Sequence, residues 1–92
     1  MSTVRVPPVL RDAVGGARQL EAHGETVGQL LDDLFGSHPD LRERVTENGE
    51  LSRFVNVYVN DRDVRYRDGL ETRIEPSDTV ILLPAMAGGD RP

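Results

Sequence analysis

The chain has no cysteine and no lysine among its 92 residues. The absence of cysteine excludes a disulfide, a thiolate metal site and a thiol nucleophile, so any sulfur chemistry needs sulfur from another molecule. The absence of lysine means that no side chain offers a primary amine for acyl transfer or for a Schiff base. All eleven basic residues are therefore arginine.

Positive charge and apolar residues are also scarce. Sixteen acidic residues against eleven basic ones give a net charge of −5 and a pI near 4.9, which argues against nucleic acid or an anionic membrane as partner. No apolar run reaches membrane-spanning length and residues 1–5 lack the order of a signal peptide, so we expect a cytoplasmic protein. Hydrophobic residues make up only 37% of the chain, which predicts one small domain with a modest core.

The usual catalytic constellations are missing as well. His23 and His38 are far apart and outside any metal-binding spacing, so we expect no metal site. No serine stands in a G-x-S-x-G turn, and Gly15-Gly16 lacks the rest of a phosphate-binding loop. The sequence therefore predicts a protein that is not an enzyme and that binds no cofactor of its own.

The clearest element in the sequence is a helix that begins after Thr26. Thr26 and Gln29 fit a capping box, and Gly36 is expected to end the helix as a left-handed cap. Pro39 predicts the first turn of a short second helix, which Asn48-Gly49 is expected to end. The first helix has one apolar stripe, formed by Val27, Leu30, Leu31, Leu34 and Phe35.

Alternating apolar and polar residues predict the strands of the fold. The first two strands are expected to form a hairpin across a turn-rich link at residues 12–16, and Pro84 is expected to halt the last strand. Because one long amphipathic helix needs a sheet face to cover it, we predict an α+β fold with a mixed sheet of four or five strands packed on one main helix plus a short second helix. The expected strands cover residues 3–6, 18–22, 54–60, an edge piece at 63–66, and 79–83.

The C-terminal segment carries the most functional information. After Pro84 the chain continues through small residues to Gly88-Gly89. An extended segment from residue 84 to residue 89 reaches roughly 20 Å. Glycine has no Cβ, so such a segment passes through a narrow channel at little steric cost. A thin tail of this kind fits into the active site of another protein.

Residues 53–65 and 82–89, together with the helix stripe at residues 27–35 and the Gly69-Leu70 element, resemble the ubiquitin-like β-grasp sulfur carriers of the MoaD/ThiS family, and its cysteine-biosynthesis branch most of all. The resemblance extends from about residue 3 to residue 89. It implies a β-grasp domain at residues 1–84, followed by a flexible C-terminal tail at residues 85–92.

The resemblance also implies how the tail works. In such carriers a MoeB/ThiF-like enzyme of the ubiquitin-activating type uses ATP to adenylate the terminal glycine carboxylate, and a sulfur donor then displaces AMP to leave a thiocarboxylate. Gly89 is thereby implied to carry the sulfur. A sulfur-acceptor enzyme such as a cysteine synthase then takes the sulfur. The implied tail residues beside Gly89 are Gly88, Ala87 and Met86.

The chain departs from this pattern because Asp90-Arg91-Pro92 follows Gly89, which therefore has no free carboxylate. We expect a protease, such as a JAMM-type metalloprotease, to remove these three residues. Otherwise the extension is an artefact of the cloned sequence, or it marks a chain that has kept the fold and lost the carrier role.

A docking surface is expected on the sheet face that points away from the helix. Arginines near this face would contact an acidic partner, although solvated arginines and singly exposed apolar residues are common in any protein. The alternatives to a carrier are a ubiquitin-like modifier joined to its targets through Gly89 and a β-grasp binding module. The expected apolar residues are Phe54, Tyr58, Ile81 and Leu83, and the arginines are Arg53, Arg65 and Arg67.

Overall fold

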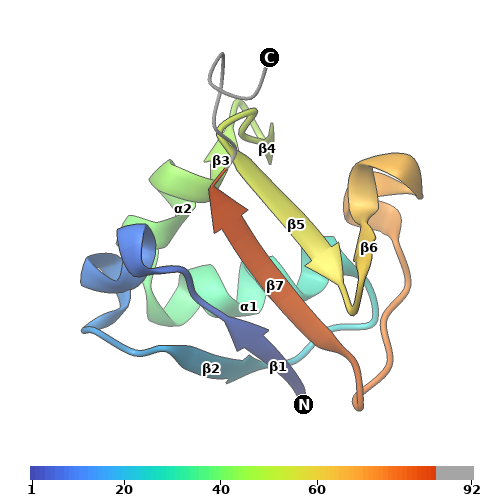
Figure 1. Ribbon diagram of the computed structural model, residues 1–92, viewed down its shortest axis with the longest axis horizontal. Helices are drawn as coiled ribbons and strands as arrows, with labels where there is room; N and C mark the ends of the chain where they lie inside the picture. The colour runs from blue at the N-terminus through green and yellow to red at the C-terminus, as the bar shows by residue number, and fades with distance from the viewer. Residues whose placement is uncertain (85–92) are drawn as a thin grey trace.

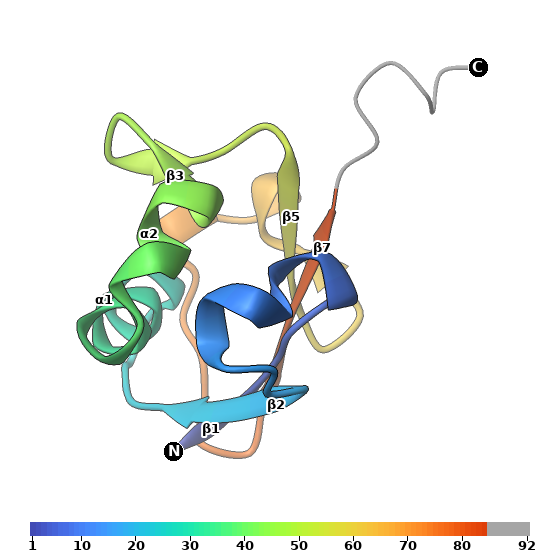
Figure 2. The same ribbon diagram turned by 90° about the vertical axis from the view of Figure 1, so that its left-hand side faces the viewer.

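A five-stranded mixed sheet curves around the main helix in the computed structural model, which describes residues 1–84 (Figures 1 and 2). Its strand order is β2-β1-β7-β5-β6. β1 and β7 run parallel at the centre, and every other neighbouring pair in this sheet is antiparallel. The strands are β1 (Ser2–Arg5), β2 (Gln19–Ala22), β5 (Val55–Val59), β6 (Arg62–Asp63) and β7 (Thr79–Pro84).

Two α-helices, three short 3-10 helices and a small separate hairpin complete the described part of the chain. The α-helices are α1 (Val27–Ser37) and α2 (Pro39–Val45). The 3-10 helices are η1 (Pro8–Val14), η2 (Val64–Tyr66) and η3 (Gly69–Glu71). The small hairpin pairs β3 (Thr46–Glu47) with β4 (Glu50–Leu51). The predicted α+β architecture, with a mixed sheet and two helices of unequal length, is confirmed.

The core lies between the sheet and α1. Alternate residues of the central strands point towards the helix, because successive side chains of a strand face opposite sides. They meet the predicted apolar stripe of α1, all five members of which are buried. Burial of each such side chain contributes about 1.5–3 kcal/mol. The fully buried members include Val4, Val57, Val80, Leu82 and Leu30.

The start of α1 has the predicted cap, and its end differs from the prediction. Thr26 Oγ1 accepts a hydrogen bond from Gln29 N (3.2 Å), and Gln29 Oε1 accepts one from Glu25 N (2.9 Å). The prediction that Gly36 is a left-handed cap was wrong, since α1 continues through it to Ser37. His38 ends the helix instead, because a residue before proline is disfavoured in the helical region and Pro39 starts α2.

Asn48-Gly49 does not end a helix, contrary to the prediction, because α2 already ends at Val45. It forms the turn between β3 and β4, with φ of 55° at Asn48 and 82° at Gly49. Two consecutive positive φ values define the tight hairpin turn that Asn-Gly favours. The prediction therefore located the turn at Asn48-Gly49 correctly, but assigned it to the end of a helix and not to a β-hairpin.

Two further predictions need correction. The turn-rich link at residues 12–16 is mostly η1, which buries Leu10 and Val14 in the core. The edge strand expected at residues 63–66 is limited to β6 and then becomes η2, because Asp63 Oδ1 accepts a hydrogen bond from Arg65 N (2.8 Å) and caps the turn. The last strand ends at Pro84 as predicted, with Pro84 itself included opposite Val55, where a missing N–H removes at most one ladder hydrogen bond.

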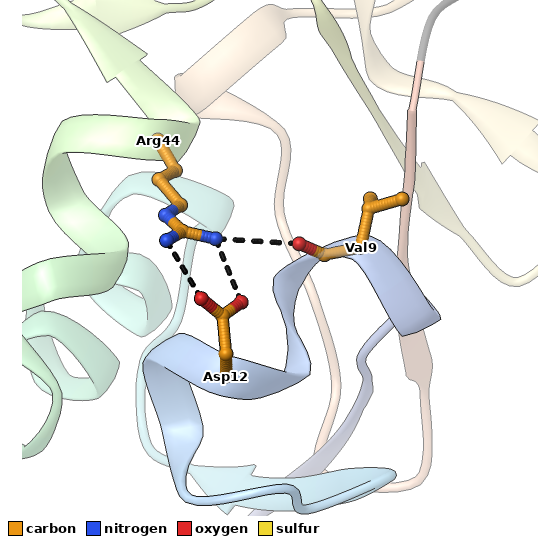
Figure 3. Close-up of polar contacts among 3 residues, drawn as sticks. All are labelled: Val9, Asp12 and Arg44. Carbon is orange, nitrogen blue, oxygen red and sulfur yellow. Dashed lines mark hydrogen bonds and ion pairs between the residues drawn. The ribbon is translucent and has the colours of Figure 1, made fainter.

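A bidentate ion pair fastens η1 to α2 (Figure 3). The two terminal nitrogens of Arg44 each donate to one carboxylate oxygen of Asp12 at 2.8 Å, and Arg44 Nη1 also donates to the carbonyl of Val9 at 3.3 Å. These hydrogen bonds lower the pKa of Asp12 below its usual value and raise the pKa of Arg44. Both side chains are largely exposed, so the pair is screened by solvent.

Candidate docking face and tail base

The register of β5 and β7 defines the outer face of the sheet. Tyr58 lies opposite Ile81, and Asn56 lies opposite Leu83. The intervening residues Val57 and Leu82 are buried against α1, so these two cross-strand pairs face away from the helix. The structure thus places Tyr58, Ile81 and Leu83 together, as the alternation predicted.

Phe54 stands one residue before β5, on the side that the alternation assigns to the same outer face. Its side chain is 50% exposed, and that of Leu83 is 41% exposed. Tyr58 and Ile81 are half-buried. We refer to Phe54, Tyr58, Ile81 and Leu83 as the outer apolar patch.

A single arginine braces the beginning of β5. Arg65 Nη2 donates to the carbonyl oxygens of Ser52 (2.6 Å) and Val55 (2.9 Å), and Arg65 Nη1 donates to Asn56 Oδ1. Ser52 Oγ in turn accepts a hydrogen bond from Phe54 N (3.1 Å). Charge-assisted hydrogen bonds of this kind are stronger than neutral ones. They fix the backbone that presents the edge of the patch.

The three arginines expected to frame the patch have different positions in the structure. Arg65 is used in the brace just described. The Arg53 guanidinium lies 5.4 Å from the centroid of the Phe54 ring, a cation–π contact at the border of the patch. Arg67 lines a separate hollow together with Arg62 and Arg73, at the turn between β5 and β6. Of these three arginines, Arg53 is the one that makes a cation–π contact with a patch residue within residues 1–84.

A second group of arginines lies beside the patch, and the sequence reasoning missed it. Arg5, Arg11 and Arg18 line a groove of about 460 Å³ whose other wall includes Ile81 and Leu83. β1 places Arg5 beside Ile81 because the two residues are partners in the parallel β1–β7 pairing. Strand alternation alone puts Arg5 on the outer face, but it does not say which strand lies next to it.

The residues expected to carry the sulfur chemistry lie outside the described residues. These are Gly89, its neighbours Gly88, Ala87 and Met86, and the extension Asp90-Arg91-Pro92. Pro84, the last described residue, ends β7 next to the groove and the patch. Among residues 1–84 no group of three or more His, Asp or Glu side chains is placed to hold a metal ion. In the same residues no helix is long and apolar enough to cross a membrane.

The fold defines a class of protein. A mixed sheet with two parallel central strands, wrapped around one long helix and followed by a Gly-Gly sequence, is a ubiquitin-like β-grasp domain. The model of the ThiS family matches residues 4–89, and the chain belongs to this family.

Relatives of known structure or description agree with this assignment. The sulfur carrier protein CysO of Mycobacterium tuberculosis is 44% identical over 90 residues, which cover 95% of this chain and 97% of CysO. The crystal structure of the Amycolatopsis orientalis BexX/CysO complex contains a chain with a TM-score of 0.90 and 44% identity, covering 97% of this chain and all of that one. The small archaeal modifier protein 1 of Methanosarcina acetivorans has a TM-score of 0.84 and 30% identity, covering 96% of this chain and 95% of its own.

These relatives are named as sulfur carriers and as small modifier proteins, and none of them is an enzyme. The family resemblance drawn from residues 53–65 and 82–89 is therefore confirmed, and the chain is a non-catalytic family member. The Amycolatopsis structure is described as a complex of CysO with BexX. One relative therefore forms a complex with another protein.

Proposed function

We propose that this protein is a sulfur carrier whose working group is the carboxylate of Gly89. The observation that carries the proposal is the family match, which ends at Gly89, in a chain 44% identical to a sulfur carrier over nearly its whole length. The outer apolar patch and the groove lined by Arg5, Arg11 and Arg18 support it, because they offer a surface next to the end of β7, at the base of the tail.

The chemistry proceeds in two balanced steps once the carboxylate is free. The carboxylate attacks the α-phosphate of ATP, forming an acyl-adenylate and releasing pyrophosphate. A hydrosulfide equivalent then adds to the acyl carbon, and the C–O bond to AMP breaks, leaving a thiocarboxylate, AMP and a proton. The proposal assigns the catalytic groups and the bound ATP to a partner of the ubiquitin-activating (MoeB/ThiF-like) type.

The extension Asp90-Arg91-Pro92 must be removed before these two reaction steps can start. Hydrolysis of the Gly89–Asp90 amide consumes one water molecule and leaves the Gly89 carboxylate with Asp90-Arg91-Pro92 as a tripeptide. A JAMM-type metalloprotease is the class of enzyme that we assign to this cut. A cysteine synthase or another sulfur-acceptor enzyme then takes the sulfur, and the carrier returns to its carboxylate form.

The test uses a chain that ends at Gly89, incubated with an adenylating enzyme, ATP and sulfide. We expect the intact mass to increase by the difference between one sulfur and one oxygen atom. A matched Gly89→Ala chain should be activated more slowly with an unchanged fold, because a Cβ crowds a narrow channel. If the wild-type chain never exchanges oxygen for sulfur with any adenylating enzyme that forms its acyl-adenylate, the proposal is wrong.

Processing is tested separately with the full chain. Incubation in extract of the source cells should shorten it by Asp90-Arg91-Pro92, and a metal chelator should stop the cut. A mass that stays unchanged in active extract would contradict removal of the extension.

A second candidate function is protein modification. The structural likeness to an archaeal modifier protein favours it, and a Haloferax volcanii modifier protein 3 is also 39% identical over 64 residues. A modifier would form a stable amide between Gly89 and an amine of another protein. Because the chain has no lysine, it cannot extend itself into side-chain-linked polymers. An adduct that survives thiols and hydroxylamine would support the modifier, whereas a free thiocarboxylate supports the carrier.

A further inference from the structure

Beside the outer apolar patch, the groove between η1 and β7 has an unusual charge for this protein. It is lined by Arg5, Arg11 and Arg18, and none of its lining residues is a carboxylate. The chain as a whole carries a net charge of −5. The groove is therefore a local concentration of positive charge on an acidic molecule.

Within residues 1–84, the guanidinium groups of this groove are not engaged in ion pairs. Within the described residues, the ion pairs below 4 Å involve Arg44 and Arg73 and none of the three groove arginines. Arg11 Nε donates to the carbonyl of Val6 at 3.1 Å, which positions its side chain while its terminal nitrogens make no hydrogen bond within residues 1–84. The nearest acidic residue of η1, Asp12, is already engaged by Arg44.

Apart from Gln19, the remaining wall of the groove is apolar. Ile81 and Leu83 come from β7, and Pro7 and Pro8 come from the entry to η1. A small inorganic anion would use the arginines but leave this apolar wall exposed to water. An extended peptide that carries both carboxylates and aliphatic side chains would use both, because guanidinium forks match carboxylates and the aliphatic groups bury against β7.

We infer that this groove, which we call the arginine groove, docks an acidic, aliphatic segment of the protein that receives the tail. Its position carries the argument, since β7 ends at Pro84 next to the groove and a partner held there lies at the base of the tail. The positive charge of the groove also orients the partner, because an acidic protein is repelled by the rest of the carrier and attracted to the groove. The identity of the partner rests on the function proposed above, whereas the charge and apolar character of its docking segment follow from the groove itself.

Binding is tested first without any partner enzyme. The full chain, labelled with ¹⁵N, is titrated with an acetylated and amidated peptide of alternating glutamate and leucine. A peptide of alternating glutamine and leucine is the neutral control. We expect the glutamate peptide to shift the amides around Arg5, Arg18 and Ile81, and to bind more weakly as the salt concentration rises.

Charge-neutralising variants assign the effect to the groove. Arg5→Gln with Arg18→Gln should weaken peptide binding by about fivefold to tenfold, since each exposed ion pair contributes modestly. Arg62→Gln with Arg73→Gln removes the same charge from the hollow at the β5–β6 turn, which also contains Asp61 and Asp78, and should have little effect. Circular dichroism and the amide spectrum show whether each pair of substitutions leaves the fold intact.

The same variants are then compared as substrates of an adenylating enzyme, using chains that end at Gly89. The groove variant should raise the KM for the carrier by several-fold with kcat nearly unchanged, and the control variant should do neither. Absence of turnover in the wild type would count against the proposed carrier function and leave the peptide result standing. The inference is overturned if the neutral peptide binds equally well, if the shifts lie outside the groove, or if inorganic phosphate produces them and the peptide does not.

Discussion

At the scale of single residues, two glycines that look alike in the sequence have opposite environments. Gly24 lies against the first turn of α1, where a Cβ would be 2.3 Å from Leu30 N and 2.8 Å from the Gln29 carbonyl carbon. Gly36 lies within α1 with nothing within 4 Å of a Cβ position. One glycine is therefore required by close backbone approach, and the other only adds conformational freedom to the unfolded chain.

This contrast predicts opposite effects on stability. Gly24→Ala should lower the free energy of unfolding by about 1–3 kcal/mol or more, because the contact is with backbone that cannot rotate away. Gly36→Ala should raise it by about 0.5–1 kcal/mol, because alanine favours the helix. Urea denaturation of both variants measures the two changes. Equal effects of the same sign would show that Gly24 does not pack against the backbone of α1 as described.

At the scale of elements, β7 contributes alternate residues to the buried core and to the outer apolar patch. Leu82 is fully buried against α1, whereas its neighbour Leu83 is 41% exposed on the outer apolar patch. Successive residues of a strand face opposite sides, so two leucines that are adjacent in sequence belong to different surfaces. β7 is central to the sheet, between β1 and β5, which makes both surfaces depend on its register.

Substitution of these two leucines tests whether Leu82 serves stability and Leu83 serves docking. Leu82→Ala should cost about 2–5 kcal/mol of stability, because it removes buried surface and leaves a cavity. Leu83→Ala should change stability by less than about 0.5 kcal/mol while raising the KM for the carrier in the adenylation assay. Thermal melts and activation kinetics, both made on the same preparations, measure the two effects. A Leu83→Ala chain that is activated normally would exclude this residue from the docking face.

At the scale of the whole molecule, the Asp12–Arg44 pair links η1 to α2 and makes stability depend on pH. Hydrogen bonds from Arg44 lower the pKa of Asp12 in the folded protein. A carboxylate whose pKa is lowered on folding stabilises the protein above its unfolded pKa, near 3.9. That contribution is lost as the pH falls through the folded value.

An Asp12→Asn chain should therefore be less stable than the wild type at pH 7, by a small amount because the pair is exposed and screened. The difference should shrink as the pH falls below about 4, where the wild-type carboxylate takes up its proton. Arg44→Gln serves as the matched control, since it removes the same ion pair from the other side. Urea denaturation at several pH values measures the effect, and a pH-independent difference would contradict it.

The local pattern was enough to predict most elements of this fold. The helix stripe at Val27, Leu30 and Leu31 and the strand alternation at residues 54–60 each lie within one short segment of the sequence. Both predictions were correct. The errors arose where one local signal suits two structures. Asn48-Gly49 reads equally well as a helix end or as a hairpin turn, and residues 8–14 show no period that distinguishes a 3-10 helix from a link.

The sequence by itself determined the apolar faces, the absence of thiol and lysine chemistry, and the family, because these depend on residue type and short spacing. The tertiary structure alone decided that β1 pairs in parallel with β7, since strands far apart in sequence find each other through the packing of the whole core. That pairing brings Arg5 beside Ile81 and so creates the arginine groove. A groove shared by distant segments is a property of their register, which no single segment encodes.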